Sequence, residues 1–209
     1  MRIFICISFL FLLAACSHPS FRSSWTKEKA PAIYTARFET SKGTFDVRVQ
    51  RSSSPQGADR FYQLVRHHYF DGLLFYRVVP GFVVQFGSID TLQVQKWERY
   101  KLSDEPLVKG NTKGTISFAR AGKESRGGHL FINLVDNPKL DTLQYAGVTG
   151  FPTFGEVVNG METVSAIYSG YGNRTMEVSD SLGADKQKFL SLFPKLDSIK
   201  KAYVMKTRQ

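Results

Sequence analysis

The sequence has 209 residues, which is enough for one domain with a sizeable hydrophobic core. Hydrophobic residues make up 42% and aromatic residues 13% of the chain, a composition that excludes an intrinsically disordered protein. The formal net charge is +10, but no block of Lys and Arg is interleaved with aromatic residues, so we expect a solvated basic surface and no nucleic-acid partner.

The first residues form a separate segment. Residues 3–13 are an apolar run that is too short to span a bilayer, and the run leads into the sequence LAAC, which ends at Cys16. This pattern is typical of a signal peptide and resembles a bacterial lipobox, whose cysteine is lipidated. We therefore expect residues 1–15 to be a lipoprotein signal peptide, Cys16 to carry the lipid, and residues 16–30 to form a tether. The alternative is an ordinary secretory signal that is cut near Ala15.

Both alternatives place the chain outside the cytoplasm. If the signal is that of a lipoprotein, Cys6 is removed and Cys16 is lipidated, so the mature domain has no free thiol and no disulfide. Ser17 stands where an aspartate would often signal retention in the inner membrane. We therefore expect a cell-envelope protein that is anchored to the membrane through its N-terminal lipid, faces the periplasm, and lies on the outer membrane rather than the inner one.

The folded domain is expected to start with a β-hairpin followed by a helix. Residues 33–39 and 44–49 alternate between apolar and polar side chains and flank a short turn. Ser54 and Pro55 are typical of the cap and the first position of a helix. The apolar residues that follow recur on one helical face until the chain turns at residues 69–72.

The remainder consists mainly of short strands separated by glycine-rich turns. A second helix is predicted at residues 161–168 and a further helical turn at residues 186–192. Many short strands with two helices are typical of a closed β-barrel, which the last strand would close against the first hairpin. The chain would then be one domain, residues 31–209, with a more polar extension at about residues 170–196. The strands are expected at residues 74–79, 82–85, 115–119, 130–134, 153–158 and 198–205.

One arginine stands inside an almost wholly apolar run at residues 75–87. An arginine there is costly to bury unless another group pairs with it. Arg77 therefore either has a structural partner or faces a pocket that takes a ligand. Gln85 adds a second polar group on the neighbouring strand, and apolar walls with a few convergent polar groups are typical of a ligand pocket.

Four sequence blocks occur in an order that resembles the cyclophilins, the peptidyl-prolyl isomerases. The resemblance covers about residues 33–170. It implies a mainly β fold, a closed eight-stranded antiparallel β-barrel capped by two α-helices, with the active site on the outer face of the barrel and with no metal or cofactor. The blocks are FYRVVPGFVVQFG at residues 75–87, GTISFARAG at 114–122, GGHLFI at 127–132 and FGEVVNGM at 154–161.

The resemblance also implies the chemistry of the site. Arg77 matches the catalytic arginine of the family. A fixed guanidinium near the prolyl nitrogen would favour the lone pair that appears on that nitrogen as the amide twists. Gln85 matches a glutamine that would bind the substrate backbone and hold Arg77 in place.

A set of apolar residues matches the cup that holds the proline ring, although each phenylalanine taken alone would be read as plain barrel core. Ala119 and Arg120 match positions that contact the peptide through their main chain. The cup residues implied by the resemblance are Phe82, Phe118, Phe131 and Leu140.

Several positions depart from the family pattern. Val83 and Phe118 stand where methionine is usual, and Phe151 lies near a position often held by histidine. His129 replaces a glutamine, and its charge would change near pH 6.5. Lys139 aligns with the tryptophan that many eukaryotic members have and that is associated with cyclosporin binding, so we expect poor sensitivity to that drug.

These observations favour an enzyme, a peptidyl-prolyl cis-trans isomerase that assists the folding of exported proteins in the cell envelope. Its partners would be proline-containing segments of those proteins, and we expect it to be a monomer. The alternative is a chaperone or scaffold that binds proline peptides in the same groove with weak or no catalysis. A structural envelope protein that uses its basic surface has no support beyond the net charge.

Overall fold

The computed structural model describes residues 20–88, 91–182 and 185–206. The expected signal peptide at residues 1–15 and the lipidation site Cys16 lie outside the described residues. No helix in these ranges is both long and apolar enough to cross a bilayer.

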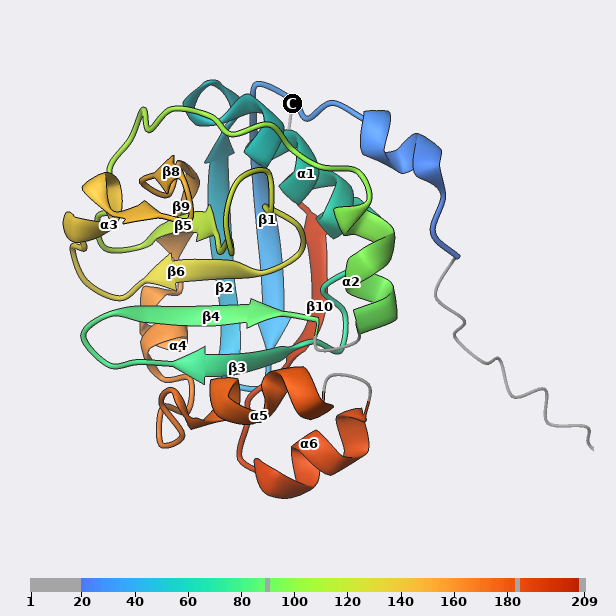
Figure 1. Cartoon of the computed structure of the whole chain (residues 1–209), viewed down its shortest axis with the longest axis vertical. Coiled ribbons are helices and arrows are strands. Elements are labelled where there is room, and N and C mark those ends of the chain that lie inside the picture. The colour runs from blue at the N-terminus through green and yellow to red at the C-terminus, as the bar shows by residue number, and fades with distance from the viewer. Residues whose placement is uncertain (1–19, 89–90, 183–184, 207–209) are drawn as a thin grey trace, which may run out of the picture.

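The fold is built on one antiparallel sheet of eight strands that curls into a nearly closed barrel (Figure 1). The strand order is β10-β1-β2-β9-β5-β6-β4-β3, so the last strand pairs with the first hairpin as the sequence predicted. The two ends of the sheet meet at a bridge between Leu74 and Ser198. The predicted mainly β barrel is confirmed. Its strands are β1 (Ile33–Thr40), β2 (Gly43–Gln50), β3 (Leu74–Val78), β4 (Val83–Gly87), β5 (Thr115–Phe118), β6 (Leu130–Asn133), β9 (Thr153–Asn159) and β10 (Ile199–Val204).

Helices lie around this barrel and exceed the two that the sequence suggested. α1 (Pro55–Arg66) and α4 (Met161–Ser165) lie near opposite ends of the barrel in Figure 1, and both were predicted, although α4 ends earlier than expected. The predicted helical turn at 186–192 is present as α6. The other elements are η1 (Ser23–Lys27), η2 (Arg51–Ser53), α2 (Thr91–Glu98), α3 (Lys139–Thr142), α5 (Arg174–Leu182), α6 (Lys186–Leu192) and a small hairpin of β7 (Gln144–Tyr145) and β8 (Val148–Thr149).

The barrel interior is filled largely by phenylalanine. Alternate residues of β1 point inward, and the ring of Phe38 stacks on that of Phe45 with their centroids 4.9 Å apart. Phe61 of α1 contacts Phe154 of β9 at 5.1 Å, which joins the helix to the sheet. Each fully buried phenylalanine contributes about 1.5–3 kcal/mol to the free energy of folding. This core therefore fixes the sheet that carries the site.

The N-terminus of α1 is capped by a residue distant in sequence. Ser54 precedes the helix as predicted, but its hydroxyl donates a hydrogen bond to the carboxylate of Glu105 instead of capping the helix itself. That carboxylate accepts the backbone N–H groups of Gln56 at 2.7 Å and Gly57 at 3.2 Å. A full negative charge is favourable at the positive end of a helix, which explains why Glu105 takes this place.

The expected tether at residues 16–30 is wrong for its second part. Phe21 packs edge-on against Trp97 of α2 with centroids 5.0 Å apart, and Trp25 stacks on His67 at 3.9 Å. The backbone N–H of Ala30 donates to Asp59 at 2.8 Å. Partial burial of two large aromatic rings against the core outweighs the polar composition of this segment, so residues 21–30 form an arm docked on the domain.

The extension at residues 170–196 folds into α5 and α6 beside β3 (Figure 1). It has a small hydrophobic cluster of its own, in which Phe189 and Phe193 of α6 pack with Leu74 and Tyr76 of β3. A further bridge joins Gly172 to Val78 of β3. The extension is thus fixed to the strand that carries Arg77.

Candidate active site

The hairpin of β3 and β4 brings the predicted polar residues together. Arg77 pairs directly with Gln85 across the hairpin, and Gln85 pairs with Phe131 of β6. Directly opposed residues of antiparallel strands point to the same face, so these three side chains share one face of the sheet. The turn between the strands contains Gly81 with a φ of +70°, a left-handed conformation that glycine adopts without strain.

Arg77 is partly buried and is held by two neutral acceptors. Its Nε donates to Oδ1 of Asn173 at 2.7 Å, and its Nη1 donates to Oε1 of Gln85 at 3.0 Å. The guanidinium lies 5.7 Å from the ring centroid of Phe82. Desolvation lowers the pKa of Arg77, although an arginine keeps its proton in proteins. Within the described ranges no carboxylate pairs with it, so its positive charge is available to a ligand.

Gln85 links Arg77 to a second pair of side chains. Its Nε2 donates to the hydroxyl of Tyr76 at 2.7 Å, and that hydroxyl lies 3.0 Å from Nδ1 of His129. The hydroxyl accepts from Gln85, and it can donate to His129 when that histidine is neutral with Nδ1 unprotonated. Burial lowers the pKa of His129, which favours this neutral form, and burial also raises the pKa of Tyr76. The donors thus run in one direction, from Arg77 to His129.

We call this hydrogen-bonded chain of Arg77, Gln85, Tyr76 and His129 the relay. An apolar cup lies next to it. Val83, Phe131 and Leu140 form a separate buried cluster. The rings of Phe131 and Phe151 meet edge-on with centroids 5.7 Å apart. The partly buried residues packed against the cluster are Phe82, Ala119 and Phe151. The structure therefore brings together most of the apolar residues that the sequence assigned to substrate binding.

Phe118 is the exception, and its assignment to the cup is wrong. It pairs with Leu130 on the inward face of the sheet and is buried in the barrel core, with its ring centroid 5.3 Å from that of Phe154. The strand alternation that turns Ser117 outward turns Phe118 inward. Lys139 begins α3 as an exposed residue.

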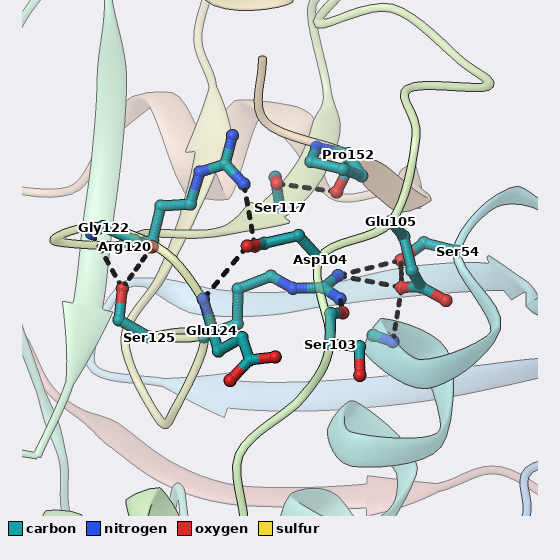
Figure 2. A network of polar contacts seen from close by, with 12 residues as sticks. Ser54, Ser103, Asp104, Glu105, Ser117, Arg120, Gly122, Glu124, Ser125 and Pro152 are labelled. Carbon is teal, nitrogen blue, oxygen red and sulfur yellow. Dashed lines mark hydrogen bonds and ion pairs between the residues drawn. The ribbon is translucent and has the colours of Figure 1, made fainter. Parts of the chain in front are cut away.

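Ala119 packs against the cup, and the side chain of the next residue, Arg120, points toward Asp104 (Figure 2). The N–H of Ala119 bonds the carbonyl of His129 at 2.9 Å. Arg120 donates to Asp104 Oδ1 at 3.2 Å, and its guanidinium lies 5.0 Å from the ring centroid of Phe151. Desolvation lowers the pKa of Arg120. The Arg120 side chain thus buttresses the back of the cup.

A cavity of about 690 Å³ adjoins the relay. Its floor contains Tyr76, Gln85 and His129, so it opens directly onto the hydrogen-bonded chain. Its other walls come from α2, from the loop at residues 119–126 and from α5. The residues that represent these three walls are Glu98 of α2, Lys123 and Ser125 of the loop, and Met176 of α5.

A polar network fixes the loop wall of this cavity (Figure 2). Arg126 donates to Glu105 Oε2 at 2.9 Å and to the carbonyl of Ser103 at 2.5 Å. Asp104 accepts the N–H of Glu124 at 3.1 Å, and the Ser125 hydroxyl accepts two N–H groups within the loop. These contacts join the loop to residues 103–105, the segment that also caps α1.

Three contributors to the site were not assigned from the sequence. Tyr76 stands beside Arg77 in the run at residues 75–87, and its place in a mostly apolar strand was a usable signal. Asn173 comes from a segment outside the four blocks, and Arg126 directly precedes the block at residues 127–132 without belonging to it. Among the described residues, no group of three or more His, Cys, Asp or Glu side chains is placed to hold a metal ion.

Comparison with known proteins shows which family the chain resembles. Residues 35–182 match the family model described as cyclophilin type peptidyl-prolyl cis-trans isomerase. Peptidyl-prolyl cis-trans isomerase A of Dickeya dadantii is 35% identical over 136 residues, which cover 61% of this chain and 67% of that protein. Peptidyl-prolyl cis-trans isomerase B of Escherichia coli is 31% identical over 137 residues, or 62% and 81% of the two chains.

A solved structure shows the same fold. The crystal structure of a cyclophilin type peptidyl-prolyl cis-trans isomerase from Cryptosporidium parvum superposes with a TM-score of 0.63. The match covers 84% of this chain and 99% of that one at 19% sequence identity. At this identity the likeness concerns the barrel and not the details of the site.

Proposed function

Because the chain belongs to the cyclophilin-type peptidyl-prolyl cis-trans isomerase family and is an isomerase, we propose that Arg77 is its catalytic residue. The observation that carries this proposal is a charged guanidinium beside an apolar cup, and both hydrogen-bond acceptors of the guanidinium within the described residues are neutral. We propose further that the substrates are X-Pro segments of exported proteins.

The reaction needs a group that weakens amide resonance. Rotation about an X-Pro bond meets a barrier of about 18–20 kcal/mol because the C–N bond is partly double. As the amide twists, a lone pair develops on the prolyl nitrogen, and a guanidinium N–H can donate to it. Arg77 uses Nε and Nη1 for its described partners, so Nη2 is left for the substrate. No proton is transferred and no covalent bond forms.

The apolar cup would hold the proline ring during this rotation. Val83, Phe131 and Leu140 line it, and Phe82 lies between the cup and Arg77. An apolar cup excludes water from the twisting amide, which strengthens the interaction with the guanidinium. In this arrangement Gln85 holds Arg77, while the main chain at Ala119 and Arg120 is placed to meet the peptide backbone.

We propose an envelope location from the N-terminal sequence. Cys16 would carry a lipid, and the arm at residues 21–30 is docked on the domain. Five residues reach at most about 18 Å, so the domain would lie close to the membrane surface. There a monomeric isomerase would act on proteins as they leave the membrane, when unaided X-Pro isomerisation takes about 10–100 s.

The catalytic proposal is tested by following isomerisation of a proline tetrapeptide with wild type and Arg77→Ala. We expect the variant to lose about 100- to 1,000-fold in kcat/KM, as when a preorganised transition-state donor is removed. Arg48→Ala removes an exposed arginine of β2 and serves as the matched control, with kcat/KM within about twofold of wild type. Equal rates for wild type and Arg77→Ala would contradict the proposal. Saturable peptide binding without faster exchange in the wild type would favour a binding module.

A further inference from the structure

The extension at residues 170–196 reaches the proposed catalytic residue with its first turn. Gly172 forms a bridge to Val78 of β3, and the next residue, Asn173, accepts the Nε–H of Arg77 at 2.7 Å. Asn173 and Arg77 are 96 positions apart in the sequence. The extension is therefore part of the site and not an appendage on the far side of the barrel.

Two hydrogen bonds fix a planar guanidinium where one would not. The bond to Gln85 alone leaves the Arg77 side chain able to turn about that contact. The second bond, from Nε to Asn173, sets the plane of the group and so the direction of Nη2. We propose that Asn173 is a positioning residue for Arg77, and that the extension thereby contributes to the isomerase site. This inference rests on the proposed catalytic role of Arg77.

The chemistry of Asn173 suits this role. A carboxamide oxygen accepts a hydrogen bond without bringing a negative charge, so it orients the guanidinium and leaves its charge for the reaction. A carboxylate at the same place would form an ion pair and reduce that charge. The choice of a neutral acceptor matches that of Gln85 on the other side of Arg77.

The position of Asn173 is itself well determined. It directly precedes α5, and its carbonyl accepts the N–H of Met176 at 2.9 Å. The α5–α6 unit is anchored by Phe189 and Phe193, which pack on Leu74 and Tyr76 of β3. Arg77 follows these residues on the same strand, so the acceptor and the donor are attached to one rigid unit.

The same turn also reaches the cavity beside the relay. Met176, three residues after Asn173, contributes to its wall together with Gln85 and His129. The extension thus meets the site at two places, once at the guanidinium and once at the wall of this cavity.

The test is a double-mutant cycle with Asn173→Ala and Arg77→Ala, using the proline tetrapeptide. Asn173→Ala should lower kcat by about three- to tenfold with KM within about twofold, the factor for losing one hydrogen bond to a charged, partly exposed group. In the Arg77→Ala background the same change should add no further loss. Glu177→Ala, an exposed change on α5, is the matched control and should leave the rate unaltered. Asn173→Ser, whose hydroxyl is too short to reach Nε, should repeat the loss.

A second measurement is independent of turnover. The ¹⁵N–¹H resonance of the Arg77 Nε–H should shift in Asn173→Ala and stay in place in Glu177→Ala. If Arg77→Ala is impaired while Asn173→Ala leaves both the rate and this resonance unchanged, the positioning role is overturned. An equal loss in the Arg77→Ala background would also overturn it, because Asn173 would then act independently of Arg77. If the wild type shows no isomerase activity, the proposed function fails, and the resonance still decides whether Asn173 holds Arg77.

Discussion

The relay from Arg77 through Gln85 and Tyr76 to His129 depends on the direction of each hydrogen bond. Gln85 uses its oxygen for Arg77 and its nitrogen for Tyr76, so its amide has one orientation that satisfies both. Tyr76 then has its hydroxyl hydrogen left for Nδ1 of His129. A neutral His129 with Nδ1 unprotonated accepts this hydrogen, whereas a protonated one would donate to the hydroxyl and turn its hydrogen away from the relay.

His129 stands where the family usually has glutamine. This histidine should make the free energy of unfolding depend on pH. Burial lowers the pKa of His129 below its ordinary value of 6.5, so the unfolded chain binds this proton more readily than the folded chain. The free energy of unfolding should therefore fall as the pH drops below 6.5, and this component should level off once the pH is below the folded pKa.

His129→Gln should remove that component while keeping an acceptor for Tyr76. The measurement is urea unfolding of wild type and His129→Gln between about pH 5 and pH 8, where the ordinary histidine pKa falls inside the range. The two proteins differ only at residue 129, so the difference between the two curves isolates His129. A difference that does not change with pH would contradict the lowered pKa.

At the level of elements, one loop supports both the first helix and the cavity wall. Glu105 caps α1, and Arg126 joins Glu105 to the loop at residues 119–126. Burial alone would raise the pKa of Glu105, but the hydrogen bonds from Ser54, the Gln56 N–H and Arg126 outweigh burial and lower it. The carboxylate is thus charged in the folded state and depends on its partners.

Removal of Arg126 should lower stability strongly because it leaves the mostly buried Glu105 carboxylate without its ion-pair partner. We expect Arg126→Ala to lower the free energy of unfolding by about 3–5 kcal/mol, the range for breaking a buried ion pair. Lys109→Ala breaks the exposed pair with Glu156 and should cost less than about 1 kcal/mol. Urea unfolding of the two variants makes the comparison, and similar losses in both would show that burial of the Arg126 pair is unimportant.

At the scale of the whole molecule, the barrel carries attachments on two sides. The arm at residues 21–30 packs through Trp25 on His67 and through Phe21 on α2, the helix that contributes a wall of the cavity. The α5–α6 unit packs on β3 and reaches Arg77. Both attachments therefore touch elements of the site, although neither belongs to the barrel sheet.

The proposed lipid anchor predicts a specific labelling pattern in bacterial cells. Cys16→Ala should abolish incorporation of radiolabelled palmitate, because Cys16 is the residue that would carry the lipid. Cys6→Ala is the matched control, since Cys6 lies in the segment expected to be removed, and it should be labelled like wild type. Labelling of Cys16→Ala, or no labelling of wild type, would contradict the anchor.

Much of the barrel could be predicted because its signals are local. Alternation along residues 33–39 and 44–49 and the turn between them suffice to indicate a hairpin, as β1 and β2 show. The helix α5 was missed because few apolar residues mark its buried face. Phe118 was misplaced because the resemblance indicated the cup, while strand register turns its side chain inward.

By itself the sequence indicated the barrel class through strand alternation and marked Arg77 and Gln85 as polar residues within one apolar run, while the apolar cup followed from the resemblance to the cyclophilins. Only the tertiary structure decided which groups hold them. Asn173 reaches Arg77 across 96 positions, and Arg126 reaches the hydroxyl of Ser54 across 72. Such contacts exist only once the sheet has nearly closed and its attachments have docked, so no local pattern of polar or apolar residues can encode them.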